Sequence, residues 1–160
     1  MSDAAATQHL LAITLPEGLV PHSPYALADR EQAVADLLSG NSFDPAGLPA
    51  GPYRLHLDLR EGRLWLDIRD AADRSLHGLA LSLSPFRRLV KDYRMVVEAH
   101  EAAVTADSHD SRVQTIDMGR RGLHDEGAAL LRARLDGKVA TDEETARRLF
   151  TLICALHSRV

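Results

Sequence analysis

The sequence predicts an α+β fold: a small antiparallel sheet, a meander of three to four strands, packed by three to four helices. Two observations lead to this prediction. Stretches in which apolar and polar residues alternate, as in strands, occur mainly in the first half of the chain, and apolar residues at helical spacing dominate the second half. Strands followed by helices favour a fold with the helices on one face of the sheet. The 160 residues contain no internal repeat or domain boundary, so we expect a single domain, 1–160, with a flexible tail at residues 1–7.

The first expected elements are a strand and a helix. A short apolar run at residues 9–14 predicts the strand. Ser23 followed by Pro24 is typical of a helix start, because serine caps the first amides and proline fits the first helical position. Gly40 suits a left-handed exit at the end of this helix. Residues 41–52 are rich in proline and glycine and predict a loop.

The alternation of apolar and polar residues is clearest in the next expected strands. Tyrosine and leucine alternate with charged residues and histidine over residues 53–60, and the pattern resumes over residues 64–69 after a turn at Glu61-Gly62. A further strand is expected at residues 76–83. We interpret these segments as an antiparallel meander with one face covered and the other partly solvated.

Amphipathic segments follow. Ser84-Pro85 repeats the helix-start pair, and apolar residues recur at helical spacing to about residue 104. A polar link is expected at residues 107–111. The next helical segment covers about residues 113–135, either as one helix or as two with a break near Gly122.

The last helix completes the predicted fold. Gly137 is the expected end of the preceding helix, and Thr141 with Glu144 matches a capping box for a final helix that runs to about His157. This helix carries the only cysteine of the sequence, Cys154, towards the edge of its apolar face. We interpret Cys154 as a small hydrophobic residue rather than a nucleophile.

Composition excludes several classes of protein. The formal net charge is −4 and the pI is about 6.0, which argues against a dedicated nucleic-acid-binding protein, because phosphate binding favours a basic surface. A single cysteine fits a reducing compartment. No apolar run reaches the roughly 20 residues that a membrane-spanning helix needs, and the first residues do not resemble a signal peptide. We therefore expect a cytoplasmic protein.

The segment at residues 113–135 holds the candidate site. On a helical wheel, Arg120 falls within the apolar stripe, Asp117 and His124 lie at the edge of that stripe, and Arg121 faces away. A guanidinium under a core-facing stripe must be paired or must reach solvent, because an isolated buried charge is very costly. Arg120 therefore requires an explanation.

Three interpretations of this segment stay open. In the structural one, Arg120 bridges to Asp117 or to a carboxylate on another element, His124 is hydrogen-bonded nearby, and Gly127 lets a neighbouring helix approach closely; ion-pair networks of this kind are common. In the functional one, Arg120, Arg121 and His124 form a corner that binds phosphate or carboxylate, with Asp117 as an orienting group. The third is an acid–base site built on His124.

Other clusters give weaker signals. His100 beside Glu101, and His109 between acidic neighbours, lack the spacing that places two imidazoles on one helical face, so we expect no metal site. No glycine-rich phosphate loop is present, so we expect no cofactor. The basic residues of the middle helix predict a solvated face rather than an RNA contact; they are Arg87, Arg88, Lys91 and Arg94.

Several longer segments of this sequence resemble a known family. They are LLSGNSF, GPYRLHL, LSPFRRLVKDY, IDMGRRGLHDEGAALLRARLDGKV and DEETARRLFTLICALH. Through them the chain is similar to the uncharacterised protein family numbered 0262, from alphaproteobacteria. The resemblance implies a cytoplasmic bacterial protein, and it supplies neither an activity nor a catalytic residue.

The sequence contains no complete catalytic motif, which leaves open whether the protein is an enzyme. The leading hypothesis is a non-enzymatic interaction or regulatory module that binds another protein or itself, as a homodimer through a helical face. The alternative is a binder or enzyme of a small anionic ligand, which would use Asp117, Arg120, Arg121 and His124. No residue is assigned a catalytic role.

Overall fold

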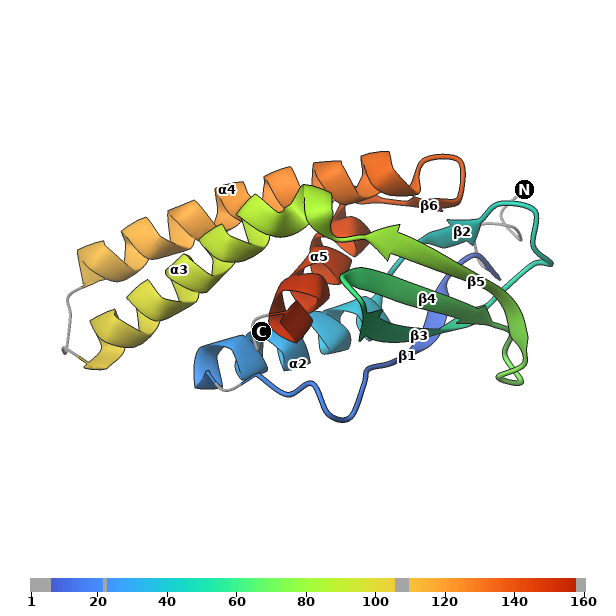
Figure 1. Ribbon diagram of the computed structural model, residues 1–160, viewed down its shortest axis with the longest axis horizontal. Helices are drawn as coiled ribbons and strands as arrows, with labels where there is room; N and C mark the ends of the chain where they lie inside the picture. The colour runs from blue at the N-terminus through green and yellow to red at the C-terminus, as the bar shows by residue number, and fades with distance from the viewer. Residues whose placement is uncertain (1–6, 22, 106–109, 158–160) are drawn as a thin grey trace.

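The computed structural model describes residues 7–21, 23–105 and 110–157, without the side chains of residues 104–117. Figure 1 shows its helices and strands. The elements in chain order are β1 (Leu10–Thr14), α2 (Pro24–Ser39), β2 (Phe43–Pro45), β3 (Tyr53–Arg60), β4 (Arg63–Arg69), β5 (Ser75–Ser82), the 3-10 turn η1 (Ser84–Phe86), α3 (Arg87–Thr105), α4 (Asp110–Leu135), β6 (Val139–Thr141) and α5 (Glu143–His157). This arrangement confirms the predicted α+β class.

The main sheet has the strand order β1-β3-β4-β5. Strands β3, β4 and β5 form the expected antiparallel meander, in which Leu57 lies opposite Leu66 and Leu66 lies opposite Leu79. Strand β1 pairs with β3 in parallel, so the sheet is mixed rather than wholly antiparallel. The cause is the connection between them: α2 crosses from the end of β1 back towards the start of β3, and only such a crossover lets neighbouring strands run in the same direction (Figure 1).

The two faces of the sheet differ in polarity, as the alternation predicts. Leu55 and Leu57 on β3, and Leu66 and Ile68 on β4, are at most 5% exposed and belong to the core. The opposite face carries charged side chains from the same strands. On that face the Nε2 atom of His56 lies 2.9 Å from a carboxylate oxygen of the following β4–β5 turn.

A second, two-stranded sheet lies outside the predicted elements. Strand β2 pairs antiparallel with β6, which places Phe43 opposite Thr141. The expectation of a loop over residues 41–52 is therefore wrong for the three residues of β2. So short a strand shows no periodicity in sequence; its partner, far along the chain, defines it. The pairing ties the α2–β3 connection to the α4–α5 connection.

The same pairing corrects the predicted capping box. Thr141 belongs to β6, and the residue that caps α5 is Asp142, whose Oδ1 atom accepts a hydrogen bond of 2.8 Å from the backbone N–H of Thr145. Glu144 instead lies in the first turn of α5. The helix thus starts one residue later than the predicted box implies.

The ends of α2 agree with the prediction at one end only. Ser23 caps the helix as expected, since its Oγ atom accepts from the Ala26 N–H at 3.3 Å. The predicted left-handed exit at Gly40 is wrong, because its φ is 179°, which is extended backbone. The Asn41 side chain ends the helix instead: its amide donates to the Leu37 carbonyl at 2.8 Å, and it also bonds the backbone of the first residue of β1.

The predicted start at Ser84-Pro85 is a 3-10 turn, η1, without a side-chain cap, and α3 follows it directly. Residues 107–109 of the expected polar link lie outside the described residues, and residues 110 and 111 already belong to α4, so the prediction of a link is wrong for these two. Helix α4 is continuous through Gly122, so the predicted alternative of two helices is wrong.

Helix α5 is the centre of the fold. Figure 1 shows α3 and α4 as a long pair on one side of the molecule and α2 on the other, with α5 between them. Every residue of α5 from Leu149 to Leu156 is buried. The close packing of α4 on α5 depends on Gly127, as the structural interpretation predicts, because a Cβ atom there would lie 2.5 Å from the ring of Phe150. This packing brings the predicted site residues of α4 beside α2 and α5.

Candidate functional site

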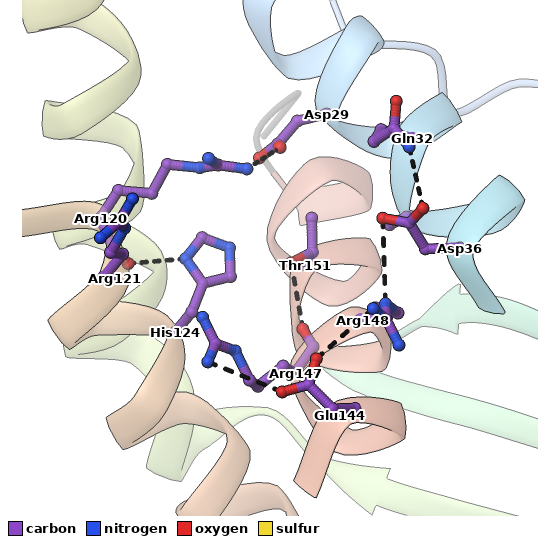
Figure 2. A pocket seen from close by; sticks show the side chains of 11 residues that line it. Asp29, Gln32, Asp36, Arg120, Arg121, His124, Glu144, Arg147, Arg148 and Thr151 are labelled. Atoms are coloured by element: carbon purple, nitrogen blue, oxygen red, sulfur yellow. Dashed lines mark hydrogen bonds and ion pairs between the residues drawn. The ribbon is translucent and has the colours of Figure 1, made fainter. Parts of the chain in front are cut away.

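A polar cavity of about 240 Å³ lies where α2, α4 and α5 meet. Figure 2 shows its lining side chains, which come from all three helices. The lining residues are Asp29, Gln32, Ala33 and Asp36 of α2, Arg120, Arg121 and His124 of α4, and Glu144, Arg147, Arg148 and Thr151 of α5. Of the four predicted ligand-binding residues, the structure brings Arg120, Arg121 and His124 to this one cavity. The Asp117 side chain lies outside the description.

Arg120 is paired with a carboxylate on another helix. Its Nη2 atom donates to Oδ1 of Asp29, and the hydroxyl of Tyr93 donates to Oδ2 of the same carboxylate at 2.8 Å. Asp29 is 8% exposed, and both of its oxygens are therefore satisfied. Burial disfavours the charged guanidinium, but the Asp29 carboxylate outweighs this effect and raises the pKa of Arg120. Tyr25 adds to the pair, because the guanidinium of Arg120 lies 5.9 Å from the centre of its ring.

His124 is held in a defined orientation on the inner face of α4. Its Nδ1 atom lies 2.7 Å from the backbone carbonyl of Arg120, so Nδ1 carries the proton and donates it. The ring stands edge-on between Tyr93, with centroids 6.1 Å apart, and Phe150, with centroids 5.8 Å apart. Burial, assisted by the charges of Arg120 and Arg147, holds the pKa of His124 below its usual value, so the ring is neutral at pH 7.

This geometry leaves one ring nitrogen of His124 as a bare acceptor. With the proton on Nδ1, the Nε2 atom of the neutral ring carries a lone pair. His124 is 5% exposed, and Nε2 has no hydrogen-bond partner among the residues that the structure describes. Buried polar atoms nearly always have a partner, so this lone pair, with the Nε–H of Arg120 that also has none among the described residues, marks a part of the cavity that is chemically incomplete.

Arg121 lies at the exposed edge of the same cavity. The wheel places it away from the core, and it is indeed exposed, yet its side chain lines the cavity. Across the described part of the chain it makes no ion pair or hydrogen bond. Arg121 is therefore a cation available to a ligand.

Helix α5 contributes two further arginines to the cavity, Arg147 and Arg148. Nη1 of Arg147 lies 3.0 Å from Oδ1 of Asp125, and Nη2 of Arg148 lies 3.4 Å from Oε2 of Glu144. The carboxylates of Asp125 and Glu144 are each more than half exposed. Exposed pairs of this kind contribute about 0–1 kcal/mol, so both arginines can turn towards another anion at little cost.

Asp29 is the main residue of the site that sequence reasoning missed. A signal for it exists: on the helical wheel of α2, Asp29 shares a face with Ala26, Ala33 and Leu37, all of which are buried. A carboxylate inside one apolar stripe and a guanidinium, Arg120, inside another are candidates for pairing with each other.

The remaining candidates lie elsewhere. Cys154 is fully buried, and burial raises the pKa of its thiol well above the usual value, which suits the predicted role as a small hydrophobic residue. In the described residues, no group of three or more His, Cys, Asp or Glu side chains is placed to hold a metal ion. On the basic face of α3, Arg88 pairs with Asp92 at 3.1 Å and with Glu126. No described helix is both long enough and apolar enough to cross a membrane.

A compact α+β domain with a charged cavity among three helices is the class of protein that this geometry defines. Residues 7–159 match the model of the family described as Uncharacterised protein family (UPF0262), and the chain belongs to that family. The predicted resemblance is therefore confirmed.

Relatives from several bacteria support the assignment. A UPF0262 protein of Granulibacter bethesdensis is 52% identical over 98% of this chain and 93% of its own length. The one from Acidiphilium cryptum is 53% identical over 86% and 84%, and the one from Agrobacterium fabrum is 40% identical over 98% and 99%. The names of these relatives state no activity. No solved structure matches the chain.

Proposed function

We propose that this protein binds a small anionic ligand, bearing a phosphate or a carboxylate, in the cavity among α2, α4 and α5. The observation that supports this most directly is the excess of arginine at the cavity: four arginines line it against three carboxylates. One of those carboxylates, Asp29, is already neutralised by Arg120 and bonded by Tyr93. Among the described residues, Arg147 and Arg148 pair only with carboxylates that are 40–59% exposed, and Arg121 pairs with none.

Arginine is suited to this role because its planar guanidinium forms paired hydrogen bonds to carboxylate and phosphate oxygens. Arg121, Arg147 and Arg148 approach the cavity from two helices, so an anion between them would be held from more than one side (Figure 2). The volume of about 240 Å³ is below the roughly 300–1,000 Å³ of clefts for drug-sized molecules, which favours a small metabolite-sized ligand. The proposal concerns binding and assigns no reaction.

Titration calorimetry on the full chain tests the proposal, with inorganic phosphate, ethyl phosphate and succinate as probes. We expect at least one of these anions to bind. Because Arg121 is exposed and unpaired among the described residues, Arg121→Ala should weaken that binding about tenfold without changing the thermal midpoint of the free protein. Arg132→Ala is the matched control, since Arg132 is an exposed arginine of α4 that does not line this cavity. The absence of binding for all three anions, and for malate and 2-hydroxyethyl phosphate as well, would overturn the proposal.

A second candidate function is self-association, which is the interaction module of the leading sequence hypothesis. Two large apolar side chains on the α3–α4 pair are exposed, Met95 at 57% and Met118 at 72%. Methionine is enriched at protein–protein interfaces relative to the rest of the protein surface. Sedimentation velocity of the wild-type chain and of the double variant Met95→Lys, Met118→Lys distinguishes the cases: a homodimer that dissociates in the variant supports this candidate, and a monomeric wild type excludes it.

The proposed site of action is the cytoplasm. The buried, reduced Cys154 suits a reducing compartment. Fractionation of cells that produce a tagged full-length chain tests this location, and recovery in the membrane or extracellular fraction would contradict it.

A further inference from the structure

The deep part of the cavity presents two hydrogen-bond acceptors, Nε2 of His124 and the Thr151 hydroxyl, beside one buried donor without a partner among the described residues, Nε of Arg120. The Nε2 atom of His124 is an acceptor because the ring proton is on Nδ1, which donates to the Arg120 carbonyl. Thr151 is 6% exposed, and its hydroxyl already donates to the backbone carbonyl of Arg147 at 3.0 Å. The oxygen of Thr151 can therefore only accept a further hydrogen bond. In Figure 2 the ring of His124 points between Arg120 and Thr151.

The edge of the cavity, in contrast, is lined by cationic arginine side chains. Arg121 is exposed and unpaired among the described residues, and Arg147 and Arg148 are about 30% exposed with only exposed carboxylates as partners. A bare anion would complement this cationic edge. It would leave the lone pair of His124 unsatisfied, however, because an anion without a proton offers no donor.

We infer that the ligand of this cavity carries a hydroxyl group beside its anionic group. The hydroxyl donates to Nε2 of His124, and the phosphate or carboxylate binds Arg121 and Arg147. This inference rests on the proposed function and specifies its ligand as a hydroxylated organic anion. A site built to accept a hydrogen bond from a hydroxyl discriminates strongly against the analogue that lacks it, because the buried acceptor is then left unpaired.

Access to Nε2 requires the side chains around it to move, because the atom is closed off from solvent. Arg147 is one of the charged groups near the ring, since its charge lowers the pKa of His124. Arg147 is held mainly by Asp125, whose carboxylate is 57% exposed. Because this pair is weak, Arg147 can turn towards an anion in the cavity at little cost.

The test compares pairs of anions that differ by one hydroxyl group, malate with succinate and 2-hydroxyethyl phosphate with ethyl phosphate, by calorimetry on the full wild-type chain. In whichever series binds, we expect the hydroxylated member to bind about tenfold more tightly or better. The two series also distinguish a carboxylate ligand from a phosphate ligand. His124→Asn keeps an N–H near the Arg120 carbonyl and removes Nε2; in this variant the ratio of the two affinities within each pair should fall to about one.

Each outcome has a definite meaning. Equal affinity for both members of every binding pair in the wild type overturns the inference and leaves the proposed function standing. No binding in either series overturns the proposed function itself, and the inference with it. A hydroxyl preference that survives unchanged in His124→Asn also overturns the inference, because another group would then provide the acceptor. The wild-type comparison needs no variant, so poor folding of His124→Asn does not remove the test.

Discussion

Arg120 and Asp29 form an ion pair between two helices across 91 residues of sequence, and each residue lies on the inward face of its own helix. The pair is not isolated, because the Tyr93 hydroxyl binds the second oxygen of Asp29 and the backbone carbonyl of Arg120 binds His124. A single network thus joins α2, α3 and α4 and forms one wall of the cavity. The structural and functional interpretations of the sequence are both compatible with this arrangement: Arg120 stabilises the wall, and His124 keeps a buried Nε2 atom without a partner among the described residues beside the cavity.

The first prediction concerns the stability of this pair. Arg120→Met should lower the free energy of unfolding by about 1–3 kcal/mol, because it leaves the Asp29 carboxylate buried without a counter-charge. Breaking a fully buried pair costs roughly 3–5 kcal/mol; we expect less here because the Arg120 side chain is 36% exposed. Urea denaturation measures it. Arg121→Met is the matched control and should change stability by less than about 0.5 kcal/mol.

A second substitution shows whether the loss comes from the stranded charge. Asp29→Asn removes that charge and keeps an oxygen that can accept from the Tyr93 hydroxyl. The double variant Asp29→Asn, Arg120→Met should therefore be more stable than the sum of the two single losses implies, by at least about 0.5 kcal/mol. Strict additivity of the two losses would contradict the ion pair as described.

The second prediction concerns the close approach of α4 to α5. Gly127→Ala should destabilise the protein by about 1–3 kcal/mol, because the new methyl group would meet the ring of Phe150 in a packed core. Gly122→Ala on the same helix is the matched control. Within the part of the chain that the structure describes, no atom outside the local helix lies within 4 Å of the position where its Cβ would be, so Gly122→Ala should stabilise the helix by about 0.5–1 kcal/mol. A stabilising effect of Gly127→Ala would mean that the helices are further apart than described.

The sequence predicted those parts of the fold that depend on local patterns. The alternation of residues 53–60 and 64–69 identifies β3 and β4 because side chains on a strand alternate between two faces. Strand β1 was expected, but its parallel pairing depends on where α2 places it, which no local pattern records. Strands β2 and β6, of three residues each, are defined by each other and show no periodicity.

The candidate site could be predicted only in part for a similar reason. The wheel identifies Arg120 and His124 because a charged or polar residue on an apolar stripe is visible in one segment. The carboxylate that pairs with Arg120 depends on how the helices pack, although the position of Asp29 on the apolar face of α2 is a usable signal. Arg121 and Arg148 carry no such signal, because exposed arginines look alike in sequence whether or not a cavity lies beside them.

The third prediction concerns the corrected cap of α5. Asp142→Ala should lower the free energy of unfolding by about 1 kcal/mol, because it removes the acceptor for the Thr145 N–H and a negative charge at the helix start. Asp142→Ser should recover most of this loss, since serine also caps well. Glu144→Gln should have an effect below about 0.5 kcal/mol, because Glu144 makes only exposed pairs. A larger loss in Glu144→Gln than in Asp142→Ala would favour the capping box of Thr141 with Glu144.

The fourth prediction concerns the pH dependence of stability. The groups around His124 are Arg120 on its own helix, Tyr93 on α3, Asp29 on α2 and Arg147 on α5. Burial and the two arginines hold the pKa of His124 below 6.5 in the folded state, so the unfolded chain binds a proton at higher pH than the folded chain does. Between these two pKa values the unfolded state carries more protons, and acidification therefore favours unfolding.

Stability from His124 is consequently complete above about pH 7 and decreases as the pH falls below 6.5, with a slope of at most about 1.4 kcal/mol per pH unit. Urea denaturation between pH 5 and 8 should show a smaller decrease in His124→Asn than in the wild type. The pKa of His157 is also lowered, by burial and by Arg94, so it contributes in the same direction, and His157→Asn serves as the matched control. The contribution of His124 to the slope of the unfolding free energy against pH should remain in His157→Asn and disappear in His124→Asn. If the slope is identical in wild type and His124→Asn, the imidazole titrates alike in the folded and unfolded chains, and the buried, neutral ring that the hydroxyl-binding inference requires is excluded.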